Sequence, residues 1–260
     1  MIGHRMVNSK ILLLKKPRVW WELEGPQVPL PPDWLAILNN FLFLLGGEEP
    51  GPDGEFHASS KVVRYDPRQN PWLPMGDMSV PPSEFAVGGI GKFIYPVTRK
   101  TRNETFYSTE RYDITHDKWE FVDPYPINKY GHEGTVVNNQ LFITGGITSS
   151  STSKQVGLVH PIKEGTIKQR TQRTSVVTNW WENKSKMNYP RCFHKMISYH
   201  RKLYVFRGVR VILKASFESP GCPSTEVYHP ETDPWTILAS KPIGGNSHRV
   251  TVVDKKKMGL

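Results

Sequence analysis

LFLLGG, at residues 42–47, is the stretch that decides the fold: a short apolar run that ends in two glycines. Similar apolar runs recur at Phe93–Val97, Leu141–Thr144 and Leu203–Phe206. The residues that follow them are Thr98-Arg99, Gly145-Gly146 and Arg207-Gly208, so two of the four glycine pairs are altered. A unit that recurs roughly every fifty residues is typical of the blades of a β-propeller. We therefore expect an all-β repeat protein.

Each repeat also carries marker aromatic residues. In three repeats a tyrosine precedes a tryptophan by seven residues, and in the third repeat Leu158–Pro161 replaces the tyrosine segment. We expect the structural positions of the repeat to be Gly46, Gly47, Gly145, Gly146, Gly208, Tyr65, Tyr112, Tyr228, Trp72, Trp119, Trp181 and Trp235.

Four antiparallel strands are expected in each blade. The first two are joined by turns that favour positive φ or exposed polar residues, at Asn39-Asn40, Gly91-Lys92, Asn138-Asn139 and Arg201-Lys202. The strand after each turn is almost continuously apolar, as when both faces are buried, and we expect it to point towards the central axis. The tyrosine lies in the third strand and the tryptophan in the fourth, where the indole can fill the space between blades.

The repeats divide the chain into three parts. Residues 1–34 are expected to form a partial blade and a linker, and residues 247–260 the truncated start of a further repeat. Between them lie four repeats, at about 35–81, 82–129, 130–190 and 191–246. The predicted fold is thus a partial propeller of four four-stranded blades with partial flanking units.

Composition excludes several classes of protein. Cys192 and Cys222 are the only cysteines, which rules out a disulfide framework and favours a reducing setting, in the cytoplasm or also the nucleus. No stretch approaches the eighteen or so apolar residues of a membrane span. No catalytic, cofactor-binding or metal-binding motif is present. His132, His194 and His248 recur at similar places, which favours a structural position of the repeat over metal ligands.

The formal net charge of +10 raises the alternative of a basic nucleic-acid-binding protein. Its lysines and arginines are scattered over many segments, however, and this pattern favours solvated loops over one nucleic-acid-binding surface.

The order of double glycine, Tyr-Asp and Trp resembles the kelch motif, at least from residue 35 to residue 235. Within that group the chain resembles the propeller part of BTB–kelch (kelch-like) proteins, which are substrate adaptors of cullin-3 ubiquitin ligases. The resemblance implies a non-catalytic protein-interaction propeller, whose partners are the target proteins of such an adaptor.

The chain also departs from that family. Neither a BTB nor a BACK domain precedes the repeats, so direct binding of cullin-3 is not expected. Pro96 lies inside a predicted central strand, where it removes a ladder hydrogen bond, and Arg207 replaces an inner glycine. These defects leave open a second alternative, a non-functional truncated copy of an adaptor.

The resemblance places target binding on loops at one face. One set joins the second and third strands, at residues 48–58, 99–107, 147–155 and 209–223; the other leads to the next blade, at 73–84, 121–133, 182–193 and 237–248. Family members often carry an arginine in the second set. The candidate target-binding residues are therefore Lys129, Tyr130, Arg191, Phe193 and Phe85. The alternative is that the aromatic residues only seal the joints between blades.

Overall fold

The computed structural model describes part of the chain, in which all regular structure is β-strand. The described residues are 11–14, 20–23, 35–69, 71–81, 85–97, 99–100, 105–106, 109–127, 129–148, 151–161, 167–170, 173–176, 179–210, 221–222 and 224–238. Within these ranges there is no helix that is long and apolar enough to cross a membrane.

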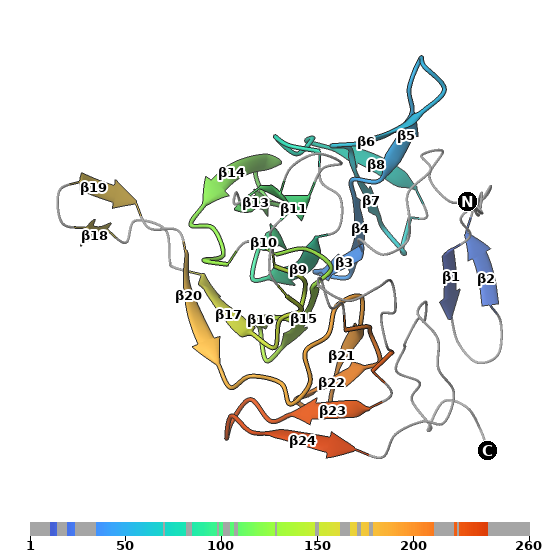
Figure 1. Cartoon of the computed structure of the whole chain (residues 1–260). Helices are drawn as coiled ribbons and strands as arrows, with labels where there is room; N and C mark the ends of the chain where they lie inside the picture. The colour runs from blue at the N-terminus through green and yellow to red at the C-terminus, as the bar shows by residue number, and fades with distance from the viewer. Residues whose placement is uncertain are drawn as a thin grey trace.

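Four antiparallel four-stranded sheets form the blades of a propeller (Figure 1). Blade 1 contains β3 (Leu35–Leu38), β4 (Phe41–Leu45), β7 (Val62–Tyr65) and β8 (Trp72–Met75). Blade 2 contains β9 (Ala86–Ile90), β10 (Phe93–Val97), β13 (Thr109–Asp113) and β14 (Lys118–Val122). Blade 3 contains β15 (Glu133–Val137), β16 (Gln140–Thr144), β17 (Val156–Pro161) and β20 (Asn179–Lys184). Blade 4 contains β21 (Lys195–Tyr199), β22 (Lys202–Phe206), β23 (Thr225–Tyr228) and β24 (Trp235–Leu238).

The first strand of each blade, and not the second, lies nearest the centre. Figure 1 shows β3, β9, β15 and β21 side by side there, with the tryptophan strands on the outside. The strand after the turn was wrongly predicted to lie towards the axis, but its apolar run is buried between blades, as expected for a strand with both faces covered. Small residues allow the inner strands to approach: a Cβ on Gly89 would lie 3.1 Å from the Ile37 carbonyl oxygen, and one on Gly134 would lie 2.9 Å from the Ala86 Cβ.

The predicted turns are correct in three blades and wrong by one residue in the fourth. Asn39, Asn40, Asn138 and Asn139 all have positive φ between 50° and 65°, and Gly91 has φ of 61°. In blade 4 the strands end at Tyr199 and resume at Lys202, so the turn is His200-Arg201, with φ of 47° and 60°. Arg201 rarely adopts a left-handed conformation, which explains the error.

Three hydrophobic clusters join consecutive blades. Between blades 1 and 2, Phe43 and Leu45 pack with Ile94 and Tyr112. Corresponding clusters lie between blades 2 and 3, around Tyr95 and Leu141, and between blades 3 and 4, around Phe142 and Tyr228. Trp119, Trp181 and Trp235 each pack at the edge of one of these clusters. These three tryptophans therefore lie in the joints between blades, as predicted, whereas Trp72 packs against Leu42, Leu44, Val63 and Tyr65 of its own blade.

Four small two-stranded sheets lie outside the blades. They are β1 (Ile11–Leu14) with β2 (Trp20–Leu23), β5 (Glu48–Pro50) with β6 (Phe56–Ala58), β11 (Arg99–Lys100) with β12 (Thr105–Phe106), and β18 (Ile167–Arg170) with β19 (Arg173–Val176). The first lies within the predicted flanking unit. Residues 247–260, predicted to begin a further repeat, lie outside the described residues, and the boundaries between repeats stay a prediction.

Two of the altered repeat positions, Pro96 and Arg207, lie within the described residues. Pairing between β10 and β13 covers only Phe93 and Ile94, whereas Pro96 still pairs with Val87 in β9. The proline thus lies beyond the point where the ladder with β13 stops. Arg207 has φ of 57°, a left-handed conformation that glycine adopts at the same place in other blades. Thr98 lies outside the described residues.

Candidate protein-binding face

The two sets of loops meet through backbone hydrogen bonds in blades 3 and 4. The Gly146 amide donates to the Arg191 carbonyl oxygen at 2.9 Å, and the Phe193 amide donates to the Gly131 carbonyl oxygen at 2.8 Å. Isolated bridges pair Tyr130 with Ile147 and Cys192 with Val209. The loops that enter and leave these blades therefore form one continuous face.

Glycine is required at this face because neighbouring backbone lies against it. A Cβ on Gly145 would lie 2.2 Å from the Arg191 carbonyl oxygen, and one on Gly146 would lie 2.9 Å from the Tyr130 carbonyl oxygen. Both glycines also have positive φ, of 63° and 97°. The double glycine therefore lets the loop of one blade lie directly on the loop that enters the next.

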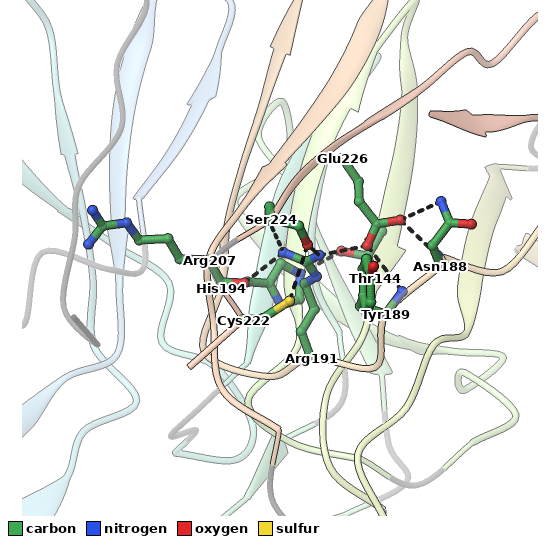
Figure 2. A network of polar contacts seen from close by, with 9 residues as sticks. All are labelled: Thr144, Asn188, Tyr189, Arg191, His194, Arg207, Cys222, Ser224 and Glu226. Atoms are coloured by element: carbon green, nitrogen blue, oxygen red, sulfur yellow. Dashed lines mark hydrogen bonds and ion pairs between the residues drawn. The ribbon is translucent and has the colours of Figure 1, made fainter. Parts of the chain in front are cut away.

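Arg191 is fully buried and belongs to a polar network (Figure 2). Its Nη2 donates to Glu226 Oε1 at 2.6 Å, and its Nη1 donates to the carbonyl oxygens of Ser224 at 3.0 Å and Arg207 at 2.8 Å. The Arg207 side chain points away from this network in Figure 2. A charge-assisted pair with this many partners fixes the loop geometrically.

Glu226 connects the same pair to the loop that enters blade 4. Its Oε2 accepts hydrogen bonds from the Asn188 amide at 2.7 Å and from Asn188 Nδ2 at 2.9 Å, and its Oε1 accepts from the Tyr189 amide at 3.2 Å. Glu110 has the corresponding role in blade 2, where its Oε2 accepts from the Ser79 amide at 3.0 Å. In blades 2 and 4, the buried glutamate in the third strand therefore holds the loop that precedes the blade.

Blade 3 lacks this glutamate. Gly157 pairs with Ile143 in β16 as Glu226 pairs with Val205 in β22, so glycine stands at the corresponding position. The Tyr125 ring takes up the space, because a Cβ on Gly157 would lie 2.3 Å from Tyr125 Cε2. Tyr125 also packs edge-on against Trp181, with ring centroids 4.7 Å apart.

Lys129 occupies in blade 3 the place that Arg191 has in blade 4. Its side chain is fully buried, with Nζ 4.6 Å from the centre of the Tyr125 ring, and Nζ has no hydrogen-bond partner among the described residues. Burial lowers the pKa of Lys129 to about 7. A cation–π contact thus replaces the arginine–glutamate pair.

His132 and His194 follow these two cations and are also fully enclosed. His132 Nε2 lies 2.9 Å from the Val97 carbonyl oxygen, and His194 Nε2 lies 2.7 Å from Thr144 Oγ1. Burial lowers the pKa of both rings, that of His132 to about 3, so both are neutral at pH 7. These contacts match a structural position of the repeat. His248 lies outside the described residues.

Of the five predicted target-binding residues, only two reach the surface. Phe193 is 46% exposed and Tyr130 is half-buried, packed against Ile147, Cys192 and Val209. Lys129 and Arg191 are 0% exposed, and Phe85 is buried in the cluster between blades 1 and 2. Binding itself is not tested by these positions, but the two cations do not offer their charge to a partner.

One exposed aromatic residue at this face escaped prediction. Tyr189 is 43% exposed, and its backbone is held by Glu226 in the loop that also carries Arg191 and Phe193. An aromatic residue between Asn188 and Pro190, in a segment otherwise polar, is the signal that identifies it. Among the described residues no group of three His, Cys, Asp or Glu is placed to hold a metal ion, and Cys192 and Cys222 are free thiols.

Comparison with known proteins identifies the repeat. Residues 190–242 match the family described as Kelch motif. Over all 260 residues the chain is 82% identical to Kelch-like protein 15 from Homo sapiens and 76% identical to Kelch-like protein 15 from Danio rerio. These alignments cover 43% of each relative, so the chain spans less than half the length of the curated relatives it matches.

A solved structure supports the same fold. The structure of YjhT superimposes with a TM-score of 0.69 at 11% identity, covering 87% of this chain and 75% of that one. At this identity the likeness shows the fold alone. The resemblance of the repeat to kelch is thus confirmed. The alignment to Kelch-like protein 15 covers the whole chain and so includes the runs at residues 10–21 and 110–119.

Proposed function

We propose that this chain is the target-recognition propeller of a cullin-3 ubiquitin-ligase adaptor, and that it binds proteins without catalysis of its own in the cytoplasm or the nucleus. The observation that carries the proposal is the 82% identity to Kelch-like protein 15 across the whole chain, in a fold built of kelch blades. Kelch propellers of this family act as interaction domains.

The loop that enters blade 4 is the proposed centre of the binding face. Phe193 and Tyr189 each expose more than two-fifths of their surface there, next to half-buried Tyr130. Aromatic side chains on a fixed backbone bury a large area at a low cost in conformational entropy, which makes them typical anchors of protein interfaces.

The buried cations have a positioning role in this proposal. Arg191 and Glu226 hold residues 188–191 through bonds to backbone and side chain, so they fix the direction in which Tyr189 points. Phe193 has φ of 51°, and its amide is bonded to Gly131 of the neighbouring loop. The anchors are therefore held in place before a target arrives.

The test compares targets captured by the chain and by two variants. The double variant Y189A/F193A removes both exposed anchors, and F121A removes an aromatic ring that is 59% exposed on the outer strand β14. Each variant is used as bait in cells, and its partners are quantified by mass spectrometry. We expect Y189A/F193A to lose partners by at least about tenfold, as hot-spot residues do, and F121A to keep them.

Thermal unfolding of the three proteins is the control for folding, because all these side chains are exposed and should contribute little to stability. If Y189A/F193A retained the same partners as the unmodified chain while F121A lost them, the binding face would lie elsewhere.

A further inference from the structure

Blade 3 differs from the other blades in the connection between its third and fourth strands. Residues 66–71, 114–117 and 229–234 make this connection in blades 1, 2 and 4, whereas residues 162–178 make it in blade 3. This longer connection contains the hairpin of β18 and β19. In Figure 1 the hairpin extends away from the four sheets, beyond the outer strand β20.

The register of the hairpin gathers its positive charges on one face. Ile167 pairs with Val176, Lys168 with Ser175, Gln169 with Thr174, and Arg170 with Arg173. Because successive positions of a strand belong to alternate faces of a sheet, this register assigns positions 168, 170, 173 and 175 to one face. That face carries all three cations of the hairpin, and residues 167–176 contain no Asp or Glu to balance them.

Within the described part of the chain, no strand pairs with the outer edges of the hairpin. Among the described residues its sheet contains only β18 and β19. An isolated two-stranded hairpin is at best marginally stable in water, and a third strand provides the missing backbone hydrogen bonds. Open edges of this kind accept extended segments of other chains.

We propose that the free edge of β18 is a docking site for an acidic, extended segment of a partner protein. The segment adds a third strand beside β18, and its acidic residues recur at every second position, as Lys168 and Arg170 do in β18. β18 is the favoured edge because it holds two of the three cations, at positions two residues apart. Opposite charges on neighbouring strands of one sheet face attract each other.

A protein segment fits this hairpin better than a nucleic acid does. Binding of single strands relies on aromatic side chains that stack on bases, and residues 167–176 contain none. An unpaired strand edge, in contrast, matches the backbone of an extended peptide. The site is separate from the loop face around Phe193, so the two proposals stand or fall independently.

The test measures fluorescence anisotropy of labelled peptides with the full chain. One probe alternates Glu and Thr over ten residues, and a matched probe has the same composition with five Glu followed by five Thr. We expect the alternating probe to bind at least about tenfold more tightly than the block probe. The variant K168E/R170E should weaken that binding by about tenfold or more.

Matched variants separate this site from the overall charge of the protein. K154E/K186E makes the same change in net charge at two exposed lysines of blade 3 and should leave binding unchanged. Replacing residues 162–178 with the sequence of residues 229–234 should abolish binding while the thermal unfolding temperature stays the same. Equal binding of both probes, or equal effects of the two charge reversals, would overturn the proposal. So would tight nucleic-acid binding that K168E/R170E abolishes, without any binding of the peptide.

Discussion

Lys129 and Arg191 lie near the ends of equivalent loops, and their surroundings differ by one carboxylate. Arg191 pairs with Glu226, whereas Gly157 stands at the corresponding position of blade 3 and leaves Lys129 over the Tyr125 ring. An ammonium group removed from water without a counter-charge is costly, and the equilibrium shifts towards the neutral amine. Because glycine and not glutamate stands at position 157, the buried Lys129 in the neighbouring loop has no counter-charge and its neutral form is favoured.

The first consequence is that the stability of the folded chain depends on Lys129 in a predictable direction. Its pKa is about 7 in the folded state, compared with an ordinary value of 10.5. Between these values the unfolded chain binds more protons, so the free energy of unfolding rises with pH. We expect K129M to remove this rise and to stabilise the protein at pH 7 by about 1–3 kcal/mol.

Urea unfolding at several pH values from 7 to 9.5 measures both effects. K154M is the matched control, because Lys154 is exposed and its substitution should leave the pH dependence unchanged. A K129M protein that is less stable than the unmodified chain at pH 7 would show that the cation–π contact outweighs the cost of burial.

Sequence reasoning identified these cations as notable but placed them on the surface. The burial of these cations depends on Glu226 and Tyr125, which the fold places beside Arg191 and Lys129 from another strand and from the same loop. Spacing alone does not reveal such pairs, since lysine and arginine are almost always exposed and nothing in the local sequence marks these two as exceptions. Phe193, in contrast, is exposed, which agrees with its prediction as an aromatic residue at the surface.

At the scale of the strands, the Tyr and Trp positions of one blade take part in hydrogen bonds that connect it to the end of the preceding blade. The Tyr228 hydroxyl donates to Asp233 Oδ1 at 2.5 Å, and the same carboxylate accepts bonds from the amide and hydroxyl of Ser185, which follows blade 3. The Trp235 indole donates to the Ser185 carbonyl oxygen at 2.8 Å. Blade 2 repeats this arrangement with Tyr112, Asp117 and Trp119 on Gly76.

Because these hydrogen bonds include the Asp233 carboxylate, we expect them to make a contribution to stability that disappears in acid. Burial raises the pKa of Asp233, but the hydrogen bonds from Tyr228 and Ser185 outweigh it and hold the pKa below 3.8. A lowered carboxyl pKa adds stability above the unfolded value, and this stability is lost as the pH falls below it. We expect D233N to lower the free energy of unfolding by about 1–2 kcal/mol at pH 7, and by less at pH 3.

Chemical denaturation at both pH values tests this prediction. D77N is the control, because Asp77 is exposed and its substitution should be nearly neutral. The same loss for D233N at pH 3 and pH 7 would contradict a role for the charged carboxylate.

Element boundaries were predictable where the chemistry of the turn is distinctive. Asn39-Asn40 and Asn138-Asn139 adopt positive φ readily, and both turns lie where they were predicted. His200-Arg201 adopts the same conformation although arginine rarely does so, and there the prediction was displaced by one position. The choice of the innermost strand was also missed, because a continuous apolar run does not reveal which neighbour buries it.

For the whole molecule, the recurrence of the motif was enough to predict four blades, because each blade is specified by its own local pattern. What the motif leaves open is how strongly the blades depend on one another. Each of the three large clusters joins only two consecutive blades. In repeat proteins of this kind, stability is approximately a sum of terms within repeats and between neighbours.

A cavity in one joint should therefore affect mainly the two blades that share this joint. Phe142 is 1% exposed in the joint between blades 3 and 4, and its ring lies 5.7 Å from that of Tyr228. We expect F142A to cost about 3–5 kcal/mol through the cavity it leaves. Amide hydrogen exchange should increase most in β16, β22 and β23, and least in β3 and β4, which are two joints away. F121A, on the exposed side of blade 2, should leave exchange unchanged. An equal increase in all four blades after F142A would instead mean that the propeller unfolds as one cooperative unit, so that its binding face depends on every joint equally.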